Sequence, residues 1–223
     1  MEKTGIIIAI DGPAGSGKSS VARLVAQRLG LVNLNTGAAY RAVALLALRE
    51  GVDLGDGKAL GRLAGRVRLE PGGVLVDGRR VPEGELRLPE VSAAASRVSA
   101  HPEVRRVLLP VQREAAERAR RAGGAVVEGR DIGTVVLPGA DLKVFLSASP
   151  EERARRRAVQ TGREGEVERI RRAILERDRQ DSERAVSPLR PAPDAAVIDT
   201  TEMGLEEVVE RVVRLARAAE GGG

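Results

Sequence analysis

Apolar residues recur along this chain in two alternating patterns, short continuous runs and longer stretches with helical spacing. The first run, residues 6–10, consists mainly of β-branched isoleucine and has the length of a buried strand. From Lys18 the apolar positions recur every three or four residues until Gly30, which predicts an amphipathic helix that ends at a glycine. Strands that alternate with helices favour an α/β fold around a parallel sheet.

The same two patterns continue to the end of the chain. A sheet of about five strands is predicted, because further apolar runs lie at 31–34, 125–128, 142–146 and 195–199. A second helix should carry Tyr40 and Leu48 on one side and end at Gly51. Further helices are predicted at roughly 90–100, 102–122, 150–162, 167–181 and 205–219. Pro110 should kink or divide the helix at 102–122. The glycines at 221–223 should be disordered.

Residues 62–89 carry a different pattern. Short alternating apolar runs at 67–69 and 74–76 are followed by Asp77-Gly78, a dipeptide typical of a tight hairpin turn. This segment therefore predicts a small antiparallel β insert. We expect one domain of 223 residues whose core spans about 1–61 and 90–220.

Composition narrows the class of protein. Apolar residues make up 42% of the chain, enough for a full core, and no apolar run approaches the roughly 18 residues of a membrane helix. The N-terminal apolar run is too short for a signal peptide. There are no cysteines, which excludes disulfides and thiol nucleophiles, and one histidine, His101. A soluble cytoplasmic protein without membrane contact is expected.

The charge is basic and dominated by arginine. The chain has 37 basic and 32 acidic residues, a net charge of +5 and a pI near 10.3. Arginine binds phosphate in a bidentate manner, so this balance points to anionic substrates or nucleic acid, although a GC-rich genome or a hot habitat produces the same composition. The only aromatic residues are Tyr40 and Phe145, too few for a protein that stacks single-stranded bases.

Residues 12–19 match the phosphate-loop pattern GxxxxGK[ST] at every fixed position, between the first strand and the first helix. The backbone N–H groups of such a loop converge on phosphates, Lys18 reaches the β- and γ-phosphates, and the hydroxyl of Ser19 binds Mg²⁺. The chain is therefore expected to bind a nucleoside triphosphate, with ATP contacts from Gly12, Pro13, Ala14, Gly15, Ser16, Gly17, Lys18, Ser19 and Ser20.

The rest of the sequence limits what the triphosphate is used for. A GTPase would need an Asn-Lys-x-Asp motif, and neither Asn33 nor Asn35 precedes a lysine. A helicase or transporter ATPase is usually longer, with a strand that ends in a clear metal-binding Asp. A small-molecule kinase remains, whose second substrate would be bound by separated arginines, namely Arg41, Arg105, Arg130, Arg177 and Arg184.

Five segments in order resemble those of one family. They are GPAGSGKSS (12–20), NTGAAYR (35–41), EGRDIGTVVLP (128–138), ERARRR (152–157) and ERDRQDSERAVSPL (176–189). Together they resemble bacterial cytidylate kinase from about residue 5 to 218. The resemblance implies a P-loop kinase domain in which the insert at about 62–89 binds the nucleoside monophosphate and a helical lid spans about 151–165. It also implies transfer of the γ-phosphoryl group of ATP to CMP or dCMP with Mg²⁺.

The resemblance also implies roles for individual residues. It places Arg41, Arg130 and Arg184 around the CMP phosphate, and Thr36 can donate a hydroxyl to the substrate. It places Ser96, Arg105 and Asp131 at the base, and Arg177 and Asp181 at the ribose. The last two are also spaced for an i,i+4 salt bridge. At least one lid arginine should close over the ATP phosphates. The expected catalytic residues are Lys18, Arg130, Arg184, Arg153 and Arg156, with Arg157 as a further lid candidate.

The sequence departs from the family pattern at two positions. Asn35 stands where an Asp is common, which puts an acidic role there in doubt, and Ala39 replaces a larger apolar residue. Arg171 and Arg172 are expected to form ordinary surface ion pairs. Two alternatives stay open, a monophosphate kinase that prefers UMP and a nucleic-acid-binding ATPase. A monomer without a nucleic-acid partner is the default expectation.

Overall fold

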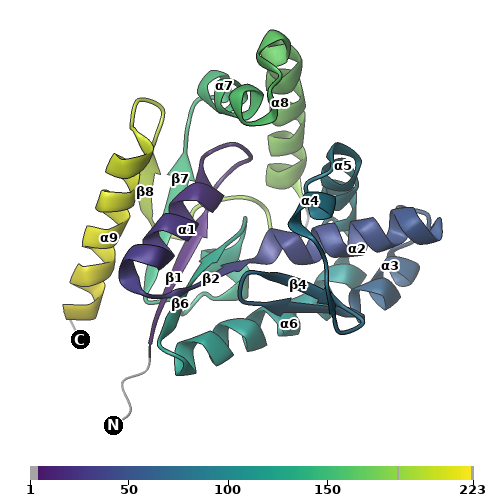
Figure 1. The fold of residues 1–223 in the computed structure, drawn as a ribbon, viewed down its shortest axis with the longest axis horizontal. Coiled ribbons are helices and arrows are strands. Elements are labelled where there is room, and N and C mark those ends of the chain that lie inside the picture. The colour runs from purple at the N-terminus through teal and green to yellow at the C-terminus, as the bar shows by residue number, and fades with distance from the viewer. Residues whose placement is uncertain (1–4, 185, 222–223) are drawn as a thin grey trace.

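The computed structural model describes residues 5–184 and 186–221, and its central element is a five-stranded parallel sheet (Figure 1). The strand order is β2-β6-β1-β7-β8, so the first strand lies in the middle. All five predicted strands are confirmed within a residue or two as β1 (Ile6–Asp11), β2 (Val32–Asn35), β6 (Gly124–Glu128), β7 (Leu142–Ser147) and β8 (Ala196–Asp199).

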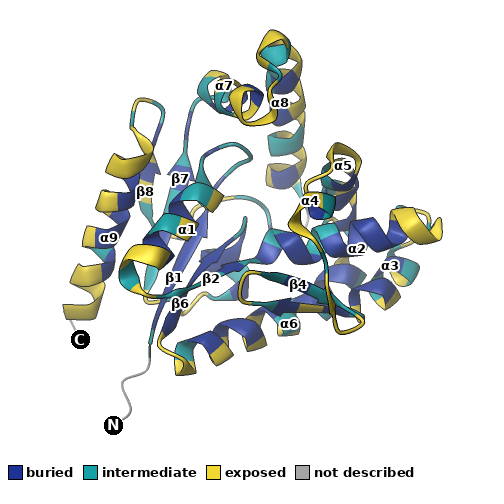
Figure 2. Ribbon diagram, viewed as in Figure 1, coloured by how far each residue is buried: buried dark blue, intermediate teal, exposed yellow. Residues whose placement is uncertain are grey.

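Helices cover both faces of the sheet, which explains the continuous apolar run of β1. Ile6, Ile8 and Ile10 pack on the face covered by α1 (Lys18–Leu29) and α9 (Leu205–Gly221). Ile7 and Ala9 face the other core, which includes residues of α2 (Thr36–Glu50), α5 (Pro89–Val98) and α6 (Pro102–Arg121). Figure 2 shows buried residues on the sides of α1, α9 and α6 that face the sheet, whereas α5 packs against α2.

The structure contradicts the predicted division of a helix at Pro110 and the predicted disorder at Gly221. Pro110 does not divide its helix, because α6 is one helix of 20 residues. Pro110 lies on the exposed side of α6, where the backbone carbonyl freed by its missing N–H can bind water. Gly221 is the last residue of α9, so the predicted disorder is wrong for this residue, and Gly222 and Gly223 lie outside the described residues.

The predicted β insert is confirmed as a three-stranded antiparallel sheet, β3 (Val67–Glu70), β4 (Gly73–Val76) and β5 (Arg79–Arg80). Asp77 and Gly78 connect β4 to β5 with φ values of 49° and 78°, the left-handed conformation that a two-residue hairpin turn requires. Short helices α3 (Gly57–Ala64) and α4 (Glu83–Leu86), which the sequence did not predict, flank this sheet.

A helical hairpin rises beyond the carboxyl end of the sheet (Figure 1). It consists of α7 (Pro150–Thr161), a 3₁₀ turn at Glu164–Glu166, and α8 (Val167–Glu183). Ala154, Ala158, Ile170 and Ile174 form a small core of its own between the two helices. In the described part of the chain, no helix combines the length and apolarity needed to cross a bilayer.

Candidate active site

The phosphate loop lies where β1 ends, and its glycines are required by geometry. Gly12 has a φ of 148°, and a Cβ at this position would lie 2.1 Å from the carbonyl oxygen of Leu146 on neighbouring β7. Gly15 and Gly17 have φ values of 78° and 87°, which side chains with a Cβ rarely adopt. The loop ends at the N-terminus of α1, so its N–H groups and the helix dipole favour an anion.

Lys18 folds over this loop. Its Nζ donates hydrogen bonds to the carbonyl of Pro13 at 2.6 Å and to the hydroxyl of Ser16 at 3.4 Å. Enclosure in the protein, followed by the charge of Arg130, lowers the pKa of Lys18 well below its usual value. An anion bound in the loop would favour the charged amine, so this environment suits a phosphate.

Ser19, the predicted metal ligand, is paired with a residue that sequence reasoning missed. Its hydroxyl donates a 2.6 Å hydrogen bond to Oε2 of Glu128, a buried carboxylate at the end of β6. Burial raises the pKa of Glu128. The available signal was the apolar run 125–127 ending in a carboxylate, on a strand that turns out to pair with β1.

The oxygens of Ser19 and Glu128 form a small hard-donor pair of the kind that Mg²⁺ accepts. Within residues 5–184 and 186–221, no group of three or more His, Cys, Asp or Glu residues could hold a metal ion. A Mg²⁺ ion needs no such cage, because it binds proteins through one or two side chains and takes its other ligands from phosphates and water.

Three arginines surround the carboxylate of Asp181, which is buried on α8. Arg130 lies 3.3 Å from it, Arg184 3.8 Å and Arg177 3.9 Å. Burial first, and then the charge of Arg177, lower the pKa of Arg130 to about 10. Among the described residues, Arg177 Nε and Arg184 Nη2 find no hydrogen-bond partner. One carboxylate among three guanidinium groups leaves positive charge that an anion would neutralise.

Arg41 and its helix lie beside the same group. Burial lowers the pKa of Arg41, and the charges of Arg130 and Arg157 lower it further. Asn35 caps this helix, α2, because its side chain accepts the N–H of Ala38 at 3.2 Å. A neutral amide serves as well as a carboxylate in this capping role, so the departure at position 35 keeps the helix start intact.

The hydroxyl of Thr36, which was expected to donate a hydrogen bond to the substrate, already donates one within the protein. Its hydroxyl donates a 2.8 Å hydrogen bond to the backbone carbonyl of Glu128. The hydroxyl has a single proton, so a donor role toward a substrate would require this bond to break. What the hydroxyl offers in this structure is an acceptor, together with a tie between α2 and β6.

Two of the three residues expected at a nucleotide base form a buried ion pair. Arg105 donates a hydrogen bond to the carboxylate of Asp131, and the two side chains are 9% and 7% exposed. The ring of Tyr40 lies 5.6 Å from the guanidinium carbon of Arg105. Ser96 has a buried hydroxyl oxygen with no hydrogen-bond partner in the described part of the chain. A cavity of about 220 Å³ adjoins Arg105 and Tyr40.

The lid arginines differ in their contacts. Arg153 is buried, pairs with Asp178, and donates to the carbonyls of Ala148 at 2.9 Å and Ala14 at 3.2 Å. Arg156 donates to Glu152 at 2.8 Å and to the hydroxyl of Thr200 at 3.0 Å. Both arginines therefore hold the hairpin to the body of the protein.

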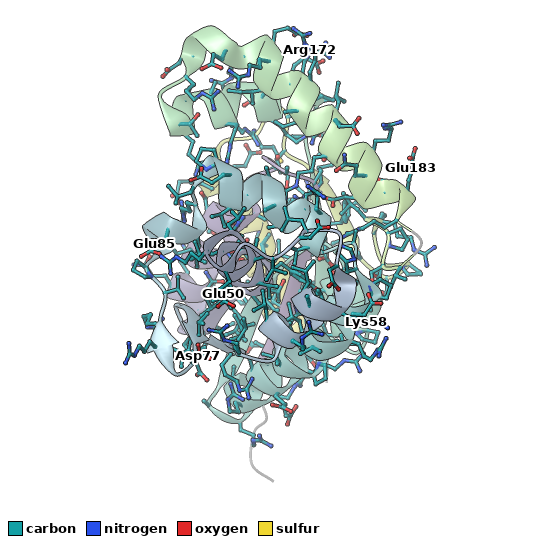
Figure 3. All side chains as sticks on the ribbon, turned by 90° about the vertical axis from the view of Figure 1, so that its right-hand side faces the viewer. Glu50, Lys58, Asp77, Glu85, Arg172 and Glu183 are labelled. Atoms are coloured by element: carbon teal, nitrogen blue, oxygen red, sulfur yellow. The ribbon has the colours of Figure 1, made fainter. Side chains whose placement is uncertain are left out.

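Arg157 is placed differently from these two. Its side chain makes no ion pair or hydrogen bond with the described residues, and its charge lowers the pKa of both Arg41 and Arg177. It therefore lies near enough to Arg41 and Arg177 for its charge to act on them. Arg171 and Arg172 pair with Glu168 at 2.9 Å and 3.8 Å, which confirms the surface ion pairs expected there. Arg172 lies on the part of the hairpin farthest from the sheet (Figure 3).

Comparison with known proteins gives a consistent result. The family described as cytidylate kinase matches residues 8–218. A cytidylate kinase of Pelotomaculum thermopropionicum is 50% identical over 96% of this chain and 96% of its own length. A cytidylate kinase of Rhodococcus opacus is 46% identical, with both chains fully covered. A bifunctional pantoate ligase/cytidylate kinase of Synechococcus sp. strain JA-3-3Ab is 50% identical, and this chain spans 40% of its length.

Solved structures resemble the chain in fold. A gluconokinase from Sinorhizobium meliloti superimposes with a TM-score of 0.51 over 99% of this chain and 97% of its own, at 18% identity. A protein from Eubacterium ventriosum gives a TM-score of 0.53 over 96% of this chain, at 12% identity. At these identities the likeness concerns the arrangement of helices and strands alone.

Proposed function

This chain belongs to the cytidylate kinase family, and we propose that it transfers the γ-phosphoryl group of ATP to CMP or dCMP, giving CDP or dCDP and ADP. The observation that carries the proposal is the arrangement around Asp181, where three guanidinium groups lie between 3.3 and 3.9 Å from one carboxylate. A dianionic phosphate is the ligand that such an excess of arginine binds.

The chemistry needs little beyond position and charge. An oxygen of the CMP phosphate attacks the γ-phosphorus, and the bond from that phosphorus to the β–γ bridging oxygen breaks to release ADP. The second pKa of a phosphate monoester is near 6, so the attacking group is mostly dianionic at pH 7 and needs no strong base. Lys18 would neutralise charge on the donor, while Arg41, Arg130 and Arg184 hold the acceptor.

The donor set at the loop suits Mg²⁺. Ser19 and Glu128 would hold the ion, directly or through water, because both offer oxygen within a 2.6 Å pair beside the phosphate loop. When bound, Mg²⁺ neutralises charge on the β- and γ-phosphate oxygens. The hydrogen bond between Ser19 and Glu128 also holds the start of α1 against the end of β6, which keeps the loop in place.

Recognition of cytosine is assigned to Ser96, Arg105 and Asp131. Cytosine offers an amino donor at N4 and acceptors at N3 and O2, which match a carboxylate and a guanidinium respectively. Ser96 is half-buried, and its buried hydroxyl oxygen has no partner among the described residues, which supports a ligand here because buried polar atoms rarely lack a partner. Uracil reverses the donor and acceptor at positions 3 and 4, which disfavours the UMP-preferring alternative.

Closure around both nucleotides would come from two segments. The α7–α8 hairpin is proposed as the lid, with Arg157 reaching the ATP phosphates. The β3–β5 sheet within about 62–89 is proposed to move as CMP enters. Closure excludes water that would otherwise accept the phosphoryl group. We further propose a cytoplasmic monomer that needs no nucleic acid, which size-exclusion chromatography and nucleotide turnover with and without DNA would test.

The direct test measures ADP formation from ATP with CMP, dCMP, UMP, AMP and GMP as acceptors. We expect rapid turnover with CMP or dCMP and a kcat/KM for UMP at least about 100-fold lower, since two mismatched polar contacts each cost about 1–3 kcal/mol. Fast turnover with UMP and none with CMP would overturn the assignment. ATP hydrolysis that requires DNA would instead support the nucleic-acid-binding alternative.

A further inference from the structure

The end of β1 is joined by hydrogen bonds to the segment that carries Arg130 and Asp131. Asp11, the last residue of the strand, accepts two backbone hydrogen bonds on its carboxylate, from the N–H of Ile132 at 2.8 Å and of Gly133 at 2.7 Å. These are the first two residues of a short π-helix, Ile132–Val136, that follows Asp131 directly. Two side-chain oxygens thus satisfy two adjacent donors that have no partner within their own helix.

The residues on either side of Asp11 reach the same segment. The carbonyl of Ile10 accepts the N–H of Gly129 at 3.0 Å, and the carbonyl of Gly12 accepts a hydrogen bond from Nη1 of Arg130 at 2.8 Å. Three consecutive residues that lead into the ATP loop therefore bind the segment assigned to the CMP phosphate and base. Residues 10 and 12 take part through their backbone carbonyls, whereas Asp11 takes part through its side chain, so a substitution at position 11 can alter this connection.

The carboxylate of Asp11 is a costly choice for a purely structural bond. It is buried, with the residue 5% exposed, and its burial raises its pKa to about 6 against the two hydrogen bonds that lower it. An asparagine of the same shape has one acceptor oxygen, and its NH₂ group would face the second N–H donor. Only a carboxylate accepts both bonds and so fixes the direction of the segment.

We propose that Asp11 is a positioning residue for phosphoryl transfer, which holds Arg130 and Asp131 at a fixed distance from the ATP loop so that acceptor and donor meet in line. The inference rests on the proposed function. CMP would still be bound by Arg41, Arg184 and Arg105 without it, so the loss should fall on the approach of the two phosphates. A displacement of about 1 Å costs on the order of 100-fold in rate.

The opposite end of β1 supplies a matched control. There Asp141 accepts the backbone N–H of Ile7 at 2.7 Å, so a carboxylate again ties β1 to a neighbouring segment. This end of the sheet lies away from the phosphate loop, and the strand that follows Asp141, β7, carries no residue assigned to ATP or CMP. Asp141→Asn makes the same chemical change beside the same strand, because it removes a carboxylate charge that also pairs with Arg120 at 3.0 Å, without touching the proposed alignment.

The experiment compares the wild-type enzyme, Asp11→Asn and Asp141→Asn by steady-state kinetics with ATP and CMP. For Asp11→Asn we expect kcat to fall about 10- to 100-fold, the KM for ATP to stay within about twofold, and the ratio of CMP to UMP kcat/KM to fall at least about fivefold. For Asp141→Asn all three quantities should stay within about twofold. The selectivity ratio and KM do not depend on the folded fraction of a preparation.

The outcomes separate this inference from the proposed function. A folded Asp11→Asn enzyme with kcat and selectivity within twofold of wild type would overturn the inference, as would equal losses in Asp11→Asn and Asp141→Asn. Failure of the wild-type enzyme to phosphorylate CMP would overturn the proposed function instead. If Asp11→Asn is not recovered folded, Asp11→Ser, which keeps one acceptor and removes the charge, gives the same readouts with the same criteria.

Discussion

The hydroxyl of Ser19 and the carboxylate of Glu128 are joined by a 2.6 Å hydrogen bond, although the two residues lie 109 positions apart in the chain. The first lies in the first turn of α1 and the second at the end of β6, which pairs directly with β1. Their side chains therefore share one point beside the phosphate loop, where two hard oxygen donors favour Mg²⁺ over softer metals.

Glu128→Gln should weaken the use of Mg²⁺ while leaving the loop able to bind ATP. The amide keeps the size and one oxygen but loses the negative charge that attracts the ion. We expect the Mg²⁺ concentration for half-maximal activity to rise at least about tenfold, because weakening an ion contact by about 1.4 kcal/mol corresponds to this factor. Glu207→Gln, on the exposed first turn of α9, is the control. An unchanged Mg²⁺ titration in Glu128→Gln would remove this residue from the metal site.

Lys18→Ala should leave the fold intact and abolish phosphoryl transfer. Among the described residues, Lys18 bonds only to the loop itself, so its removal leaves the core undisturbed, while a cation preorganised at the transferring phosphate is lost. Loss of such a group costs several kcal/mol in transition-state stabilisation, or about 10³-fold in kcat. Lys58→Ala, on the exposed side of α3, should behave as wild type. Near-normal kcat in folded Lys18→Ala would exclude the phosphate loop as the catalytic cradle.

Asp131→Asn should narrow the preference for CMP over UMP, mainly by reducing activity with CMP. The ionised carboxylate accepts from the cytosine amino group but would oppose the O4 lone pairs of uracil, whereas an amide can donate to O4. The ratio of kcat/KM for the two substrates should fall at least about tenfold. Because Asp131 adjoins Arg130 and pairs with Arg105, a general loss could come from disturbed neighbours. A uniform loss with both substrates would place the cytosine pocket elsewhere.

Among the lid arginines, Arg157→Ala should reduce kcat most directly. Both side chains are exposed, but the charge of Arg157 acts on Arg41 and Arg177, whereas Arg155 pairs with Glu152 on its own helix. We expect Arg157→Ala to lower kcat at least about tenfold and Arg155→Ala to change it less than twofold. Melting temperatures of the two variants should agree with wild type. A larger kinetic effect from Arg155 than from Arg157 would contradict this assignment.

The strands and the phosphate loop could be predicted because their signals are local. A continuous apolar run such as residues 6–10 needs no distant partner to be recognised. The α3 helix was missed because Gly57 and Gly61 lower its helix propensity, and Gly61 is there to let the helix approach Glu103 of α6, where a Cβ would lie 3.3 Å from that residue's own Cβ.

Site residues that depend on strand order could not be read from the sequence alone. Glu128 lies beside the phosphate loop only because β6 pairs with β1. Asp11 contacts the segment after Asp131 only because that segment lies at the end of β1 in the folded protein. Long arginine side chains present the same difficulty. Arg156 and Arg157 are adjacent in sequence, yet Arg156 donates to Thr200 whereas the charge of Arg157 acts on Arg41. Both partners are distant in the sequence, so the local pattern does not predict them.

The pH dependence of stability should carry the signature of Asp11. Its pKa rises from 3.8 to about 6 on folding, since burial outweighs the hydrogen bonds from Ile132 and Gly133, with the charges of Asp131 and Lys18 acting in opposite directions. The native state then binds this proton more tightly than the unfolded chain between these two values. The contribution is therefore fully present below pH 3.8 and is lost as the pH rises through about 6.

Asparagine cannot ionise, so Asp11→Asn lacks this loss, and the free energy of unfolding of wild type minus that of the variant should fall by about 1 kcal/mol from pH 5 to pH 7.5. Urea denaturation of both proteins at the two pH values measures the difference directly. Activity should move the opposite way, since the ionised carboxylate is the form that accepts both N–H groups. The prediction is contradicted if the difference in the free energy of unfolding between wild type and Asp11→Asn stays constant or rises with pH. In that case the two hydrogen bonds that lower the pKa of Asp11 would outweigh the burial that raises it.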